Sequence, residues 1–209
     1  MEINENWAEL IGIIIGDGNI YRKNNKYRIG FVGDIINDKL YFEYIKDLIK
    51  KEWKKDARIF IGGRGIRIVI NSKEICQLLI EKIGLPYGEG KSEIVTIPKF
   101  ILEDWNLTRR TIRGITDTDG SVFAVKKPGV DRYPSIEITT NSKNLALQIR
   151  ESLMKRDFRV ANIWSFKSKM SKNTGYRFGL NGKINLQKWV NEIGFSNPYK
   201  LERAISYLN

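Results

Sequence analysis

The pattern of hydrophobic and polar positions divides the chain into two halves that repeat one another. Leu10–Gly18 reads LIGIIIGDG and aligns with Ile112–Gly120, which reads IRGITDTDG. Both segments have Gly at the third position and end in Asp-Gly, and the stretch from Leu10 to Ile15 is apolar around nearly its whole circumference. A helix of that kind must be buried on two sides. The repeat therefore predicts two copies of one fold unit, each opened by a buried helix.

Further elements follow in the same order in both halves. Amphipathic helices are expected to begin at Asp38 and Lys143, and a strand leads into a helix at Ile70–Lys73 and again at Leu180–Lys183. Each half therefore reads as helix, two strands, helix, two strands, helix, which is an α+β unit. Alternation and β-branched residues predict strands at 27–32, 59–71 with a glycine hairpin turn at 62–65, 121–125, 135–140, 161–167 and 176–180.

A polar connection separates the two halves. Pro and Gly residues recur between Pro86 and Trp105, as expected for a linker. We expect a first domain at residues 1–97, with the linker from about residue 86, and a second domain at residues 98–209.

Composition narrows the class of protein. Lys and Arg total 36 against 24 Asp and Glu, a formal net charge of +12, which favours a polyanionic partner. A basic ribosomal protein or one with a merely charged surface is the alternative. The chain has no His, which excludes Ser-His-Asp triads and His-containing metal sites, and its single cysteine, Cys76, is expected to pack as a small hydrophobe. The longest apolar run, Leu10–Gly16, is far shorter than the ~18 residues of a membrane span, so we expect a soluble intracellular protein.

The repeated helix has a consequence for chemistry. We expect Asn6 to cap the first copy. Gly12 and Gly16 are four residues apart, as are Gly114 and Thr118 in the second copy. Small residues at that spacing let two helices pack closely, and such packing brings Asp17 and Asp119 together.

Two carboxylates at helix C-termini are unfavourable unless a cation is present. Each faces the negative end of a helix dipole and repels the other. Carboxylates and free carbonyls form an all-oxygen site that suits Mg²⁺ better than Zn²⁺. Alternatively, Asp-Gly merely ends each helix, with Gly18 and Gly120 in the left-handed conformation. The occurrence of the same motif in both repeats of a basic protein favours the metal site.

The motif Thr111–Val122, TIRGITDTDGSV, together with Leu10–Gly18, resembles those of LAGLIDADG homing endonucleases in their single-chain form. The resemblance covers nearly the whole chain, including Ile97-Pro98-Lys99. It implies an αββαββα fold in each half and two antiparallel sheets that form a saddle on double-stranded DNA. It also implies a monomer, acting as a pseudo-dimer and encoded within an intron, that leaves short 3′ overhangs in a long, non-palindromic target.

The resemblance further implies roles for individual residues. Asp17 and Asp119 would bind Mg²⁺, with Mn²⁺ as a substitute, and the carbonyls of Gly16 and Thr118 would help. Water activated by the metal is then the expected nucleophile. Asp117 is expected to cap or to form a salt bridge rather than to bind metal.

Basic and polar residues are expected beside the two aspartates. Lys73 and Lys183, at equivalent strand-to-helix junctions, would lie near the scissile phosphates, unless they are solvated lysines at helix starts. Glu137 would organise water in the second half. Its first-half counterpart would be Val32, or Asp34 if the register slips.

DNA readout is expected from strands that carry Arg and Lys at alternating positions, since a β-ribbon fits the major groove. Half or more of these residues would contact only phosphate or solvent. They are Arg22, Lys26, Arg28, Arg64, Arg67, Lys126, Arg132, Lys167, Lys169 and Arg177.

Two alternative functions use the same scaffold: an intron-splicing maturase that binds host intron RNA, and a DNA-binding protein that does not cleave. The presence of both Asp17 and Asp119 favours the enzyme. An intein domain is less favoured, because Met1 is not a splice nucleophile and no His precedes Asn209.

Overall fold

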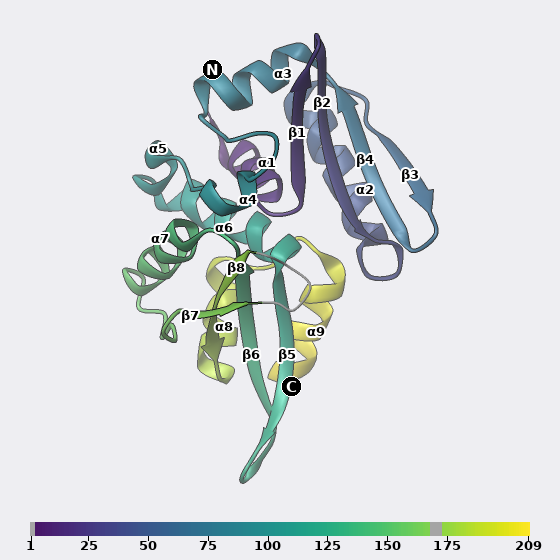
Figure 1. The fold of residues 1–209 in the computed structure, drawn as a ribbon. Helices are drawn as coiled ribbons and strands as arrows, with labels where there is room; N and C mark the ends of the chain where they lie inside the picture. The colour runs from purple at the N-terminus through teal and green to yellow at the C-terminus, as the bar shows by residue number, and fades with distance from the viewer. Residues whose placement is uncertain (1–2, 168–172) are drawn as a thin grey trace.

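Two four-stranded antiparallel sheets, each with helices on one face, make up the protein (Figure 1). The computed structural model describes residues 3–167 and 173–209. The strand order is β1-β2-β4-β3 in the first sheet and β5-β6-β8-β7 in the second. Because both sheets have the same order, the predicted repeat and the α+β fold are confirmed. Within the described residues, no helix is long and apolar enough to cross a membrane.

The first half follows the predicted order and adds a first strand that the sequence did not define. The second helix of this half, α2, is capped by Asp34, whose carboxylate accepts hydrogen bonds from the backbone N–H groups of Ile36 and Asn37. The elements are α1 (Glu5–Ile15), β1 (Gly18–Lys23), β2 (Lys26–Asp34), α2 (Ile35–Trp53), β3 (Arg58–Gly62), β4 (Gly65–Asn71), α3 (Lys73–Gln77) and the π-helical turn η1 (Leu78–Lys82).

Two short helices in the linker lead to the second half, which ends in a helix that was not predicted, α9. Ile97, at the end of the proposed first domain, forms two hydrogen bonds with the side chain of Gln148 in α7. The Gln148 amide accepts from the backbone N–H of Ile97 and donates to its carbonyl oxygen. The elements are α4 (Lys91–Ile94), α5 (Lys99–Leu102), α6 (Trp105–Asp119), β5 (Gly120–Lys127), β6 (Val130–Thr140), α7 (Lys143–Met154), β7 (Trp164–Lys167), β8 (Thr174–Asn181), α8 (Lys183–Glu192) and α9 (Pro198–Leu208).

The two motif helices, α1 and α6, pack backbone against backbone. A methyl group at Gly12 would lie 2.1 Å from the carbonyl oxygen of Thr111, and one at Gly114 would lie 2.4 Å from that of Glu9. The predicted close packing is therefore confirmed, and glycine is required at both positions. The cap is two residues earlier than predicted: Asn4, not Asn6, accepts the hydrogen bond from the N–H of Trp7.

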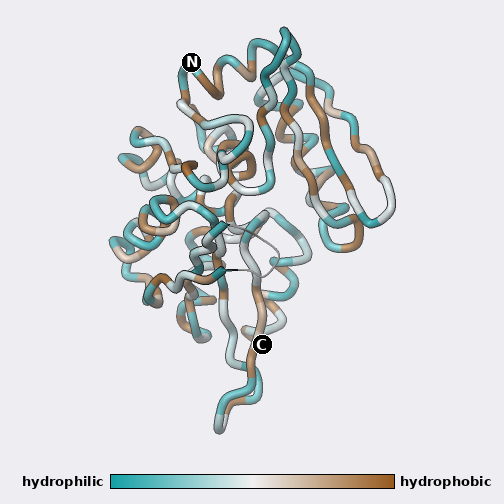
Figure 2. Tube along the Cα trace, viewed as in Figure 1, coloured by the Kyte–Doolittle hydropathy of each residue, from teal (hydrophilic) through white to brown (hydrophobic). Residues whose placement is uncertain are grey.

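Each sheet has a helix-covered face and an outer face. In β2, Ile29 and Phe31 are buried whereas Arg28 and Val32 are exposed, and the same alternation recurs in the other strands. Figure 2 shows it as brown segments alternating with pale and teal ones. The outer faces are the surfaces from which side chains reach a partner.

Candidate metal and nucleic-acid site

The ends of α1 and α6 bring the two predicted aspartates together. Asp17 follows the C-cap of α1, and Asp119 is the last residue of α6. A methyl group at Gly16 would lie 3.4 Å from an Oδ2 atom that belongs to Asp119. The carboxylate of one motif thus lies against the backbone of the other.

The electrostatics of this pair favour a cation. Burial, reinforced by the charge of Asp17, raises the pKa of Asp119 to about 7. Burial also raises the pKa of Asp17. No hydrogen bond from another described residue reaches either carboxylate. Within the described part of the chain, the four oxygens of these carboxylates thus have no hydrogen-bond donor and can bind a ligand.

Two lysines that were not predicted as site residues satisfy the helix ends beside the aspartates. Lys91 Nζ donates to the carbonyl oxygens of Ile14, at 3.0 Å, and Gly18. Lys200 Nζ donates to four carbonyl oxygens at the end of α6: Thr116 at 2.8 Å, Asp117 at 2.7 Å, Thr118 at 3.1 Å and Gly120 at 2.6 Å. Burial lowers the pKa of both lysines. Asp119 and Asp17 oppose that shift at Lys91, and at Lys200 it is opposed first by Asp117 and Asp38 and then by the same two aspartates. Each ammonium therefore sits at the negative end of a helix dipole.

A sequence signal for these lysines exists in the repeat. Lys91 follows Gly84 by seven residues, and Lys200 follows Gly194 by six, where both glycines come after the third helix of their half. The two lysines are thus equivalent by repeat alignment. They lie in α4 and α9, the helices that follow the third helix of each half, and not at strand-to-helix junctions, which is why the alignment of those junctions did not find them.

The structure does not bring Lys73 and Lys183 to the aspartates. Lys73 Nζ lies 5.8 Å from the ring centroid of Tyr27, and Lys183 Nζ donates to the carbonyl of Leu208 at 3.2 Å. The reason is the strand register: β4 ends opposite Arg28, three residues along β2 from Phe31, which pairs with Gly18 beside the site. The structure therefore places neither lysine in contact with the aspartates, and their placement beside the scissile phosphates stays a prediction.

Asp117 and the Thr118 carbonyl have other partners. Asp117 is buried, and its Oδ2 accepts a hydrogen bond at 2.8 Å from the backbone N–H of Ser196, in the loop before α9. Burial raises its pKa, and the charge of Lys200 opposes that shift. As predicted, Asp117 points away from the paired carboxylates, but it anchors a loop rather than capping a helix. The Thr118 carbonyl, predicted to help hold a metal, accepts the ammonium of Lys200.

Glu137 lies on the outer face of the second sheet, near the site. It is opposite Ser121, two residues after Asp119, and its Oε1 is 3.8 Å from Arg177 Nη1. In the first sheet the equivalent ladder position, opposite Asn19, is Gly30. The predicted counterpart, Val32 or Asp34, is therefore wrong, and the first half has no carboxylate at that position.

The outer faces carry some of the basic residues predicted for DNA readout. Lys26, Arg28 and Arg67 are on the outer face of the first sheet, where Arg67 lies over Phe60. Arg177 is on the outer face of the second sheet and lies over Phe166. Sequence reasoning missed Lys23 and Arg58, which share the face of Lys26 and Arg67.

The other predicted DNA contacts are placed differently. Arg22 is on the helix-covered face and pairs with Glu81 at 3.1 Å, and Arg132 lies over Tyr207 of α9. Lys167 alternates with Phe166 and so faces away from the outer surface. Arg64 is in the β3–β4 turn, Lys126 adjoins a register shift in β5, and Lys169 lies outside the described residues.

A groove runs from Asp17 along the basic outer face of the first sheet. Its volume is about 420 Å³, and its walls run from Asp17 and Asn19 past Arg28 and Val32 to Arg67. One end is acidic and the rest is cationic or apolar. The groove therefore suits an anion whose reacting group lies at the acidic end beside a bound cation.

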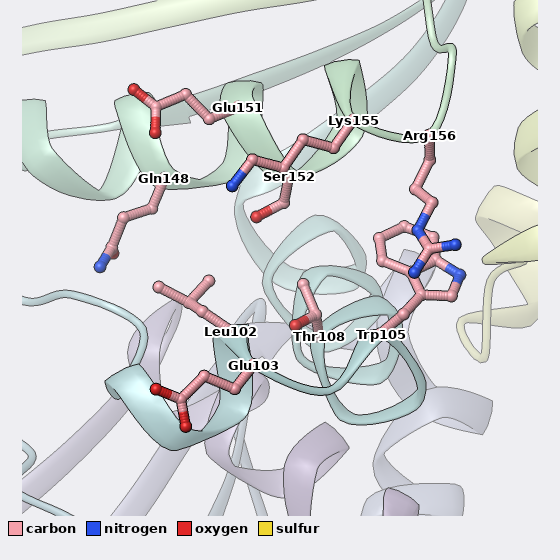
Figure 3. Close-up of a pocket in the computed structure, with 9 residues that line it drawn as sticks. All are labelled: Leu102, Glu103, Trp105, Thr108, Gln148, Glu151, Ser152, Lys155 and Arg156. Carbon is pink, nitrogen blue, oxygen red and sulfur yellow. The ribbon is translucent and has the colours of Figure 1, made fainter.

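A separate cavity of about 220 Å³ lies between α5, α6 and α7, away from the aspartates (Figure 3). Arg156 stacks over Trp105 on one side, at 4.9 Å from the ring centroid. Glu103 and Glu151 face the same cavity together with Lys155. These mixed charges give no preference for a polyanion, so we do not assign this cavity to the site.

Comparison with known proteins bears on this geometry. Residues 106–194 match the family model of the LAGLIDADG-like domain. The second half of the chain is thus similar to that domain. The resemblance drawn from the two motifs is thereby confirmed.

Solved structures share the fold over the whole chain. I-DmoI in complex with DNA and Mn is 17% identical, with a TM-score of 0.60 over 92% of this chain and 98% of that chain. The homing endonuclease I-WcaI bound to its DNA recognition sequence is 15% identical, with a TM-score of 0.60 over 100% of this chain and 88% of that chain. The predicted LAGLIDADG architecture, with two half-domains in one chain, is confirmed.

The curated relatives are longer proteins. The replication factor C small subunit of Methanocaldococcus jannaschii is 30% identical over 210 residues, which are 99% of this chain and 10% of that protein. The tRNA-splicing ligase RtcB of Pyrococcus furiosus is 25% identical over 224 residues, 95% of this chain and 22% of that protein. The two names denote different activities, so neither describes the shared segment.

Proposed function

We propose that the chain is a site-specific DNA endonuclease that depends on a divalent metal. The observation that carries the proposal is the pair Asp17 and Asp119, two carboxylates that no other described residue hydrogen-bonds, at the ends of two packed helices. A basic groove begins at Asp17. The similar fold of I-DmoI in complex with DNA and Mn supports the same assignment.

The two carboxylates fit Mg²⁺, with Mn²⁺ as a substitute, because they are hard oxygen donors that carry like charge at close range. Among the described residues, no cluster of three or more His, Cys, Asp or Glu side chains could enclose a metal. The remaining positions would go to backbone carbonyls such as that of Gly16, to water and to a DNA phosphate. A bound divalent cation supplies charge neutralisation at the phosphate and lowers the pKa of water.

The chain's own residues have distinct roles in this proposal. Lys91 and Lys200 hold the carbonyls at the ends of α1 and α6, and their charges reduce the repulsion between the aspartates and an approaching phosphate. Glu137, on the outer face beside the second motif, orients water in that half only.

The arrangement of the halves determines the product and the oligomeric state. Each aspartate would serve one DNA strand, which gives a double-strand break with short 3′ overhangs. The target is long and non-palindromic, because the two outer faces differ. Both motif helices belong to one chain, so a single copy supplies both aspartates, and light scattering without DNA is expected to give a monomer of 24.2 kDa.

Cleavage assays on Asp17→Asn and Asp119→Asn test the proposal. The target is first selected from a randomised duplex library and placed in a plasmid. With Mg²⁺, each variant is expected to lose double-strand cleavage while binding the target within a few-fold of the original chain, because Asn removes a ligand and also relieves repulsion. Asp56→Asn, which changes an exposed aspartate in the loop between α2 and β3, is the matched control and keeps full activity.

The outcomes separate the alternatives. Undiminished linear product from either aspartate variant would contradict the metal site. A nicked circle from one variant would show that each carboxylate serves one strand. If the original chain binds duplex or intron RNA and cuts nothing with Mg²⁺ or Mn²⁺, the protein is a binding protein or maturase instead.

A further inference from the structure

Gly30, in the middle of β2, is a glycine that the packing of the first sheet does not require. A methyl group built there would have one neighbour within 4 Å, the carbonyl oxygen of Ile68 at 3.7 Å, and the backbone has no positive φ. Gly33 on the same strand is different, because a methyl group there would lie 2.6 Å from the ring of Phe42. A glycine inside a strand weakens it, and it often marks a place where a ligand approaches the backbone closely.

Gly30 lines the groove that begins at Asp17, which has a volume of about 420 Å³. Its neighbours on the outer face of β2, Val32 and Arg28, line the same groove and are both exposed. Each is two residues from Gly30, or about 7 Å along the strand. The outer face therefore has a dip, with Gly30 at its floor and Val32 and Arg28 at its two ends.

Two arginines flank the dip without covering it. Arg28 lies over the ring of Tyr21 on β1, at 5.2 Å from the ring centroid, and Arg67 lies over Phe60 on β3 at 5.6 Å. Since β1 and β3 are the two edge strands of this sheet, the guanidinium groups are held on opposite sides of Gly30. Phosphates can reach both guanidinium groups while an uncharged part of the same ligand occupies the dip.

In the second sheet the equivalent position carries a side chain. Glu137 takes the place of Gly30, because each is opposite the residue that follows a motif glycine. The glycine at that level of the second sheet is on the neighbouring strand, where Gly179 is opposite Glu137. A carboxylate at this position opposes the approach of a phosphate backbone. The close approach that Gly30 permits is therefore expected on the first sheet.

We propose that the dip at Gly30 receives a deoxyribose of the DNA strand that passes Asp17, and that the missing side chain sets how closely this strand approaches the site. The proposal rests on the proposed function as far as DNA binding goes, but not on cleavage. The C–H surface of a deoxyribose suits the bare backbone of Gly30 and the methyl groups of Val32. The phosphates on either side of the sugar carry the charge that Arg28 and Arg67 bind.

Variants of Gly30 test the proposal, because they are expected to move stability and DNA binding in opposite directions. Gly30→Ala should raise Tm by about 1–4 °C, since alanine fits the strand and restricts the unfolded chain. Gly30→Val places three carbons in the dip and should weaken binding by about tenfold, and Gly30→Ala should weaken it less. Binding is measured in EDTA, on the duplex selected from the randomised library, so that cleavage plays no part.

Gly62→Val is the matched control. It adds the same side chain to the outer face at the end of β3, outside the groove, where a methyl group would have no neighbour within 4 Å. We expect this variant to bind within about twofold of the original chain.

Hydroxyl radicals identify what occupies the dip, because they attack the deoxyribose of DNA. At saturating protein, Gly30→Val is expected to lose the protection of sugars near the centre of one half-site and to keep the protection elsewhere. Target selection repeated with Gly30→Ala is expected to return the same sequence, because a sugar carries no base identity.

The proposal is overturned if Gly30→Val binds as the original chain does, or if Gly62→Val loses as much binding as Gly30→Val. A lower Tm for Gly30→Ala would show that the fold itself requires the glycine, and a changed base preference would place a base edge in the dip instead of a sugar. If the chain cleaves its target and Gly30→Val binds normally, this proposal alone fails. If the expected binding losses occur without any cleavage, the endonuclease proposal alone fails, and if no duplex is bound, both fail.

Discussion

The C-terminal ends of the two motif helices have the same parts but different surroundings. At the end of α1, Lys91 reaches two carbonyls from the linker helix α4. At the end of α6, Lys200, which belongs to α9, donates to four carbonyl oxygens of that helix end. The buried Asp117 lies next to this lysine, and the first copy has Ile15 at the equivalent position. Both copies of the repeat thus have the aspartate and the lysine, but these residues are not equally buried in the two copies. The second end is the more heavily buried and the more dependent on its lysine.

Removing the lysines gives the largest expected difference between the two ends. Lys200→Met leaves four carbonyls and Asp117 without their cation, so we expect a loss of about 3 kcal/mol in the free energy of unfolding. Lys91→Met leaves two carbonyls and is expected to cost about 1.5 kcal/mol. Urea denaturation of both variants measures the difference.

Lys183→Met is the control for these variants. Its exposed ammonium contacts a carbonyl near the end of α9, and we expect a change within about 0.5 kcal/mol. Equal losses from Lys91→Met and Lys200→Met would show that the two helix ends are energetically equivalent.

The pH dependence of stability sharpens the comparison further. The pKa of Asp119 is about 7 in the folded chain against an ordinary value of 3.8, so the unfolded state loses this proton first as pH rises. The contribution of Asp119 to the free energy of unfolding in EDTA is therefore expected to fall between about pH 4 and pH 7. Asp119→Asn removes this part of the fall, and each kcal/mol corresponds to about 2–4 °C in Tm.

Thermal melts at pH 5 and pH 8 check this expectation. In Asp119→Asn, Tm is still expected to fall with rising pH, but by less, because the pKa values of Asp117 and Asp17 are also raised. Adding Mg²⁺ at pH 8 should raise the Tm of the original chain more than that of Asp119→Asn. A variant that loses as much Tm between the two pH values as the original chain would contradict the assignment.

The outer faces give the smallest expected difference, in the salt dependence of DNA binding. Arg67→Ala should lower the slope of log K against log salt by about 0.9, the contribution of one phosphate. Arg177→Ala should lower it less, because Glu137 already offsets that charge. Arg22→Ala, on the helix-covered face with Glu81, should leave the slope unchanged. Fluorescence anisotropy over a salt series distinguishes the three variants. Equal slopes for Arg67→Ala and Arg177→Ala would contradict the expectation that the two outer faces differ in their phosphate contacts.

The paired aspartates were predictable because their placement depends on short-range features. Gly12 and Gly114 remove side chains from the faces that meet, and the aspartates follow a few residues later on the same helices. Once two such helices pack, the positions of Asp17 and Asp119 are determined. The order of strands and helices in each half was predictable for a similar reason, since alternation and helical periodicity are local.

The cations around the site were not predictable in the same way. Lys91 and Lys200 reach the helix ends from α4 and α9, whose positions depend on tertiary packing. Lys73 and Lys183 are truly equivalent in the repeat, but equivalence does not say which end of a sheet a junction occupies. That follows only from the strand register. Arg22 was assigned to the DNA surface because β1 had not been defined, so its side of the sheet could not be inferred from Ile20.

The packing of α1 on α6 also determines the order in which the protein becomes stable during synthesis. Trp7–Ile15 is buried throughout, yet α6 begins ninety residues after α1 ends. At roughly 5–20 residues per second, the ribosome needs about 5 to 20 s to complete the second helix after the first. For that interval the newly made first half exposes the side of α1 that packs on α6, while its other side packs within the first half. A fragment that stops before α6 is therefore expected to self-associate through this side of α1. In the chain that contains both motifs, this self-association is prevented only after the second motif has emerged from the ribosome.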